Sequence, residues 1–87
     1  MLRNGTVRSL AQGTQVIRAH ETEVDCFYNV INEPDGERLL HLSTFGSDYR
    51  QSRPKSSQSI QIGEDIAREL ISLLEATFPG VRNQPRQ

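Results

Sequence analysis

The sequence predicts a single α+β domain, with an antiparallel β-meander of four to five strands followed by one C-terminal amphipathic helix. Three observations lead to this prediction. A turn motif separates two alternating segments, the alternating segment SQSIQI follows a Ser-rich stretch, and a helical apolar repeat comes directly after it. The domain is expected to span residues 1–79, and residues 80–87 are expected to form a polar tail.

The segment NEPDG marks a tight β-hairpin. Pro34 presets φ for the second position of a type I turn, Asp35 suits the third position, and Gly36 supplies the left-handed residue of a bulge. Because this is the pattern of a three-residue hairpin loop, Glu33 is expected to face Glu37 across its ends.

Counting outward from this loop pairs Val30 with Leu40 and Tyr28 with Leu42. Ile31 with Leu39 and Cys26 with Thr44 follow in the same register. Alternation then sorts the side chains onto two faces. The face expected to be the core comprises Val24, Cys26, Tyr28, Val30, Leu40, Leu42 and Thr44. The opposite face comprises Asp25, Phe27, Asn29, Ile31, Leu39, His41, Ser43 and Phe45.

Further strands are expected on both sides of the hairpin. Upstream, residues 15–20 include the β-branched pair Val16 and Ile17, and residues 6–10 predict a shorter strand. Downstream, residues 57–62 alternate and end on two β-branched side chains, which predicts the last strand.

The C-terminal helix begins with Glu64 and Asp65 in its first turn, where negative charge complements the helix dipole, and ends at Pro79 and Gly80. Its apolar stripe comprises Ile66, Ala67, Leu70, Ile71, Leu73, Leu74 and Phe78. A helix with such a stripe is expected to lie on the sheet or against a second helix of its own kind.

Composition adds expectations about partners and location. A chain this short, with 34% hydrophobic residues, builds only a thin core, so association into a homo-oligomer, most simply a dimer, is expected. The single cysteine excludes an intrachain disulfide and a multi-cysteine zinc site. The sequence has neither a secretory signal pattern nor an apolar run of membrane-spanning length, which predicts a cytoplasmic protein without a membrane partner.

Catalytic and metal-binding patterns are weak. The register puts Cys26 and His41 on opposite faces, which disfavours a nucleophilic pair, and the two histidines lack metal-ligand spacing. The alternating carboxylates Glu21, Glu23 and Asp25 are consistent with a metal-dependent hydrolase or, more simply, with a charged strand edge. Because no phosphate loop or nucleophile elbow is present, we predict a non-enzyme without metal or cofactor.

Binding is the stronger hypothesis, because aromatic rings on an open sheet beside a basic loop suit single-stranded nucleic acid. Bases stack on rings, while Arg and Lys track the phosphates. The candidate nucleic-acid-binding residues are Arg50, Arg53, Lys55, Tyr49, Phe27 and Phe45. The alternative is that the two Phe rings are covered by the N-terminal strands or form a protein-interaction patch, as in an accessory subunit.

The order of strands, basic loop, last strand SQSIQI and helix GEDIARELISLLEATF resembles the single-stranded-DNA-binding domain of the coactivator family called positive cofactor four. The resemblance covers residues 14–78 and rests on element order and the junction between the last strand and the helix. It implies four strands and one helix, dimerisation through the helices, single-strand binding on curved sheets, and a role in transcription regulation.

Overall fold

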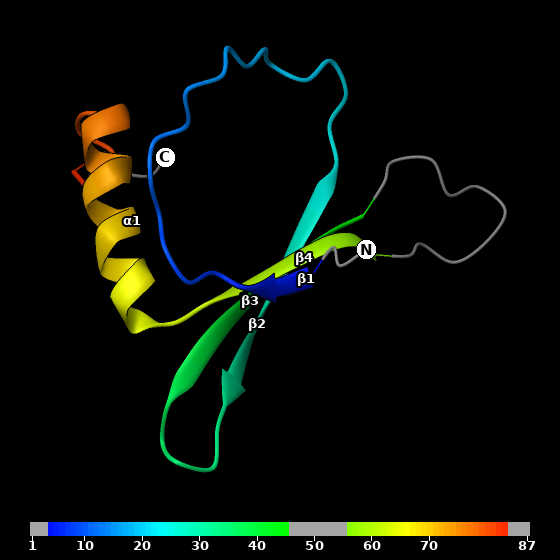
Figure 1. Ribbon diagram of the computed structural model, residues 1–87, viewed down its shortest axis with the longest axis vertical. Helices are drawn as coiled ribbons and strands as arrows, with labels where there is room; N and C mark the ends of the chain where they lie inside the picture. The colour runs from blue at the N-terminus through cyan, green and yellow to red at the C-terminus, as the bar shows by residue number, and fades with distance from the viewer. Residues whose placement is uncertain (1–3, 46–55, 84–87) are drawn as a thin grey trace, which may run out of the picture.

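The computed structural model describes residues 4–45 and 56–83, which form one sheet and one helix (Figure 1). The elements are β1 (Asn4–Thr6), β2 (Asp25–Asn32), β3 (Arg38–Phe45), β4 (Ser56–Ile62) and α1 (Glu64–Thr77). The predicted α+β class, with a sheet followed by a C-terminal helix, is confirmed.

The sheet has the strand order β1-β4-β3-β2 and is mixed. Strands β2, β3 and β4 form the predicted antiparallel meander, but β1 pairs in parallel with β4. The sheet was predicted to be wholly antiparallel, and β1 does not follow that prediction. Residues 7–24 carry the chain from the β1 edge of the sheet to the β2 edge, and a connection of that length permits parallel pairing (Figure 1).

The hairpin between β2 and β3 forms as its local chemistry predicts. The amide of Glu33 donates to the carbonyl of Glu37 at 2.8 Å, and Gly36 has a positive φ of 94°. The Asp35 carboxylate accepts from the Glu37 amide at 2.9 Å, which closes the turn. The predicted cross-strand pairs are all present: Ile31–Leu39, Val30–Leu40, Tyr28–Leu42 and Cys26–Thr44.

The N-terminal prediction was wrong in part. Residues 15–20 form no strand, and Val16 and Ile17 are 97% and 75% exposed. The short strand expected at residues 6–10 lies instead at Asn4–Thr6, with one further backbone bond from Val7 to β4. A β-branched pair favours a strand only where it meets a partner strand, and residues 15–20 pair with neither of the edge strands β1 and β2.

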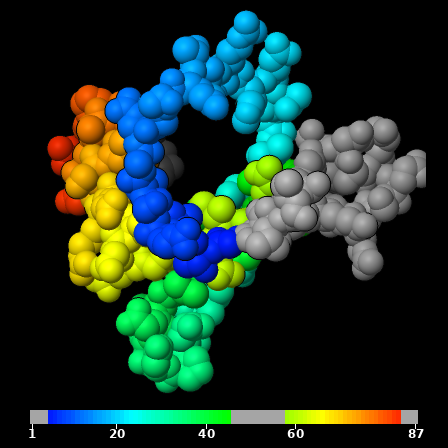
Figure 2. Space-filling model, in the orientation of Figure 1, coloured from blue at the N-terminus to red at the C-terminus, as the bar shows by residue number. Residues whose placement is uncertain are grey.

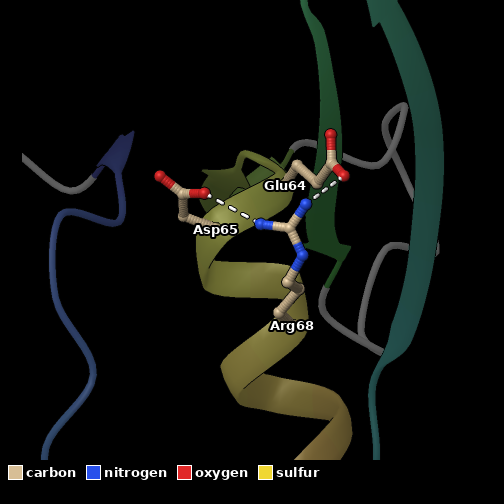
Figure 3. Close-up of polar contacts among 3 residues, drawn as sticks. All are labelled: Glu64, Asp65 and Arg68. Carbon is tan, nitrogen blue, oxygen red and sulfur yellow. Dashed lines mark hydrogen bonds and ion pairs between the residues drawn. The ribbon is translucent and has the colours of Figure 1, made fainter.

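Helix α1 begins and ends near the predicted positions. Gly63 precedes it in an extended conformation and offers no side-chain cap. The guanidinium of Arg68 instead links the two acids of the first turn, at 2.7 Å from Glu64 and 3.2 Å from Asp65 (Figure 3). Such exposed pairs three and four residues apart add modestly to helix stability.

The helix does not cover the sheet. It makes only slight contact with the strands and stands beside them, starting where β4 ends (Figure 1). Among the described residues, Ile62 and Ile66 are the buried hydrophobic side chains. Within one chain, therefore, the expectation that α1 lies on the sheet is not met.

The face expected to be the core is consequently open on β2. Tyr28 is 71% exposed and Val30 is 56% exposed, and Cys26 is also exposed. On β3 the facing side chains Leu40 and Leu42 are half-buried. Alternation identified the apolar side of the hairpin correctly, but burial of that side requires a covering layer that α1 of the same chain does not supply.

Candidate functional site

Two chemically different surfaces result from the paired strands β2, β3 and β4. We call one the apolar face; it comprises Tyr28, Val30, Leu40, Leu42, Ile60 and Ile62. We call the other the polar-aromatic face; it comprises Phe27, Asn29, His41, Ser43, Phe45 and Gln61. The division follows from the cross-strand register and from the alternation of side chains along each strand.

A pair of aromatic rings occupies one end of the polar-aromatic face. Phe27 on β2 and Phe45 on β3 lie diagonally across the hairpin, with ring centroids 5.3 Å apart and planes at 85°. This edge-to-face geometry is favourable for aromatic pairs and holds both rings in place. Phe27 remains 58% exposed and Phe45 is half-buried. The structure thus brings together the two predicted ring residues and leaves Phe27 accessible.

Small side chains lie next to Phe27 in its cross-strand row. Phe27 is opposite Ser43 on β3, and Ser43 is opposite Ser59 on β4. Ser43 is 6% exposed, so its side chain is buried within this face. Because neither serine is bulky, the ring of Phe27 has no large neighbour in its own row.

The next row of the face carries hydrogen-bonding groups. Asn29, His41 and Gln61 are cross-strand neighbours on β2, β3 and β4. The side-chain amide nitrogen of Gln61 lies 3.0 Å from Nδ1 of His41. An amide nitrogen can only donate, so Nδ1 accepts, and the neutral imidazole then carries its proton on Nε2. This row therefore offers amide and imidazole groups beside the rings.

The remaining predicted site residues, Tyr49, Arg50, Arg53 and Lys55, lie outside the described residues. They belong to residues 46–55, which connect β3 to β4. The two ends of that connection, Phe45 and Ser56, are cross-strand partners. The basic stretch is therefore attached at the end of the sheet that carries the ring pair.

The catalytic alternatives gain no geometric basis. The register places Cys26 and His41 on opposite faces, as predicted. In the described part of the chain, no three His, Cys, Asp or Glu side chains gather closely enough to hold a metal ion, and Glu21, Glu23 and Asp25 are included in that part.

Gln61 was not among the predicted site residues. The alternation in SQSIQI places Gln61 on the other face of the strand from Ile60 and Ile62, but the sequence does not show which residue of a neighbouring strand pairs with it. The β3–β4 register contains an irregularity between Thr44 and Phe45, and ten residues separate the strands. No turn motif of the hairpin kind sets this register, so the pairing of His41 with Gln61 became visible only in the folded chain.

Comparison with protein-family models, with curated proteins and with solved structures found no match to this chain. Within residues 4–45 and 56–83, no helix is both long and apolar enough to cross a membrane.

Proposed function

We propose that this protein is a non-catalytic nucleic-acid-binding module that takes single-stranded DNA or RNA on its polar-aromatic face and acts as a small dimeric regulator. The observation that supports it is the accessible ring pair of Phe27 and Phe45, which lies beside a hydrogen-bonding row. The basic stretch of residues 46–55 is attached at the same end of the sheet.

Each part of this face has a role in the proposal. A base stacks on Phe27, over the small side chains of its row, because every base offers a π-face. The Nε2 proton of His41 and the amide of Asn29 contact base edges or sugar oxygens. Arg50, Arg53 and Lys55 neutralise phosphates, and Tyr49 adds a further ring. No covalent bond changes in this scheme.

The setting follows from the sequence. The likeness in element order to the positive cofactor four family favours a role in transcription regulation. The lone Cys26, exposed on the sheet, suits a reducing compartment, which in this proposal is the cytoplasm.

Fluorescence anisotropy with a labelled oligothymidine, titrated at two salt concentrations, tests the proposal. Phe27→Leu keeps apolar bulk but removes the ring, and we expect affinity to fall by about fivefold to a hundredfold because stacking contributes about 1–3 kcal/mol per base. Phe27→Tyr, the matched control, keeps the ring and should bind like the parent. Absence of binding at low salt, or equal affinities for Phe27→Leu and Phe27→Tyr, would overturn the proposal.

The cations are tested by the salt dependence of the same titration. Replacing Arg50, Arg53 and Lys55 together with Ala should reduce the slope of log affinity against log salt by about two, since each lost phosphate contact on a single strand removes about 0.7. An unchanged slope would remove these three residues from the interface while leaving the ring pair to be judged by the Phe27 variants.

A protein-interaction or accessory-subunit module is the second candidate, and the exposed apolar face favours it. This function predicts no affinity for oligothymidine and binding to a protein partner that is insensitive to salt and, because Phe27 lies on the opposite face of the sheet, unaffected by Phe27→Leu. The anisotropy series therefore separates the two functions.

A further inference from the structure

Strand β2 forms one edge of the sheet and is long for an edge strand. It has eight residues, whereas β1 at the opposite edge has three. Apart from Ile31, every residue of β2 is exposed. Figure 2 shows the turn end of the hairpin, in green, projecting below the helix in this view. An exposed edge of this length offers a row of backbone groups with which another strand can pair.

The hairpin register shows which backbone groups of β2 point outward. The Glu33 amide donates to the Glu37 carbonyl, so this pair is hydrogen-bonded, and hydrogen-bonded pairs alternate with non-hydrogen-bonded pairs along an antiparallel ladder. Counting from the turn, the pairs that Val30, Tyr28 and Cys26 form with β3 are non-hydrogen-bonded. The N–H and C=O groups of these three residues therefore point away from β3. Among the described residues, no backbone bond joins them to another segment.

The same three residues direct their side chains to the apolar face, where Tyr28 and Val30 are exposed. An incoming antiparallel strand would form hydrogen-bonded pairs with them and place its own side chains beside theirs. Apolar residues at every second position of that strand would thus extend the apolar face. The residues between them would lie on the polar-aromatic face, which favours polar side chains there. The edge of β2 therefore suits a peptide in which apolar and polar residues alternate.

Acidic side chains lie at both ends of β2. Residues 21–45 carry six acids against one cation, Arg38. Three of the acids precede or begin the strand, and three lie in and beside the turn: Glu21, Glu23, Asp25, Glu33, Asp35 and Glu37. No described Lys or Arg forms an ion pair with any of them, and between Asp25 and Glu33 the strand carries no charge. A peptide with Lys or Arg at both ends matches this pattern.

We propose that the edge of β2 accepts an extended segment of a protein partner as an additional antiparallel strand, with alternate apolar residues and with Lys or Arg at both ends. Antiparallel pairing continues the arrangement of β2 with β3, and it uses the outward backbone groups directly. The inference goes beyond the proposed function and does not depend on nucleic-acid binding.

A second copy of β2 is a poor occupant of this edge. Antiparallel pairing of two β2 strands would bring the acids that precede one strand next to the turn acids of the other. Parallel pairing would bring like acids together, and like charges on neighbouring strands are destabilising. The charges of the edge therefore favour a basic partner over a copy of this chain.

Fluorescence anisotropy of the labelled synthetic peptide KKVTVTVKK, titrated with the full chain, tests the pairing. In the proposed register its valines lie opposite Cys26, Tyr28 and Val30, so their N–H groups point to β2 and those of its threonines point away. N-methylation of two valines should weaken binding at least about tenfold, because two backbone hydrogen bonds are lost. N-methylation of the two threonines is the matched control and should stay within about threefold of the parent peptide. No binding of the parent peptide, or a loss from threonine methylation as large as that from valine methylation, would overturn the proposal.

The charge requirement is tested with one variant of the chain and its control. Glu23→Lys reverses a charge beside the start of β2 and should weaken binding of KKVTVTVKK by about threefold to tenfold. Glu69→Lys makes the same change at an exposed position of α1, which makes at most slight contact with β2, and should stay within about twofold of the parent chain. Equal affinities of the two variants for the peptide would overturn the basic partner.

Two further outcomes concern the other occupants and the other function. Sedimentation velocity of the chain, alone and with the peptide, would reveal a dimer that the peptide dissociates; that result would assign the edge to a second copy and overturn the proposal. A chain that binds oligothymidine but not the peptide would overturn this inference and leave the proposed function in place. Peptide binding that behaves as expected, without binding of oligothymidine, would refute the proposed function alone.

Discussion

The two faces of the sheet are made by alternate residues of the same strands, yet they call for different surroundings. Tyr28 and Ile60 on the apolar face are exposed although their side chains favour burial. Their sequence neighbours Phe27 and Gln61 lie on the opposite face, where amide, imidazole and hydroxyl groups surround one pair of rings. Neighbouring residues along one strand thus belong to two different surfaces. One surface is stabilised by an apolar cover, and the other suits a polar, hydrated ligand.

The two faces therefore suit different kinds of partner. An uncovered apolar face is stabilised by contact with another apolar surface, and the gain is largely independent of salt. A polar-aromatic face loses little by remaining in water and can exchange water for bases and phosphates. Variants that act on one face only can therefore separate the two.

The largest effect is expected on the apolar face. Ile62→Ala removes one of the buried hydrophobic side chains and should lower the free energy of unfolding by about 2–5 kcal/mol. Ile60→Ala is the matched variant on the same face and strand, and its smaller effect should reflect its 43% exposure in a single chain. Urea unfolding at one fixed protein concentration measures both. Equal losses for the two variants would mean that Ile60 is buried by a partner.

The second effect concerns the β2–β3 turn, which sets the register and thereby assigns each side chain to one face of the sheet. Gly36 has a φ of 94°, and a Cβ at this position would meet nothing within 4 Å. Gly36→Ala should therefore cost about 1–2 kcal/mol through backbone strain alone. Gly13→Ala is the control, because Gly13 is equally open but lies outside the left-handed region. Thermal unfolding measures the Tm of both variants. Equal shifts in Tm for Gly36→Ala and Gly13→Ala would contradict the strain argument.

The smallest of the three effects belongs to the polar-aromatic face. Gln61→Ala removes the hydrogen bond to Nδ1 of His41, and a net loss of about 1 kcal/mol in the free energy of unfolding is expected. Nitrogen NMR of His41 provides the independent reading, since loss of the Gln61 amide beside Nδ1 should change the ratio of the two imidazole tautomers. The same tautomer population in parent and variant would show that Gln61 does not hold the ring.

The hairpin was predictable because all its determinants lie within a few residues. Pro34, Asp35 and Gly36 specify a turn type, the turn type specifies a register, and the register assigns each side chain to a face. The start and the end of α1 were predictable for the same reason, from the acids of its first turn and from Pro79 and Gly80.

Other features depended on contacts between distant segments. The β-branched pair at Val16 and Ile17 indicated a strand, yet it pairs with neither edge strand of the sheet. The parallel pairing of β1 with β4 and the bond between His41 and Gln61 join residues far apart in the chain. Local propensity does not encode such pairings, because their free energy comes from the partner strand.

By itself, the sequence determined the α+β class, the β2–β3 hairpin with its register, and the amphipathic character of α1. Each of these follows from steric preferences and hydrophobic periodicity over short stretches of chain. Only the tertiary structure decided that the sheet is mixed, that α1 stands clear of its own sheet, and that the expected core face is open. Periodicity tells which side of an element is apolar, but what covers that side is decided by packing between elements and between chains.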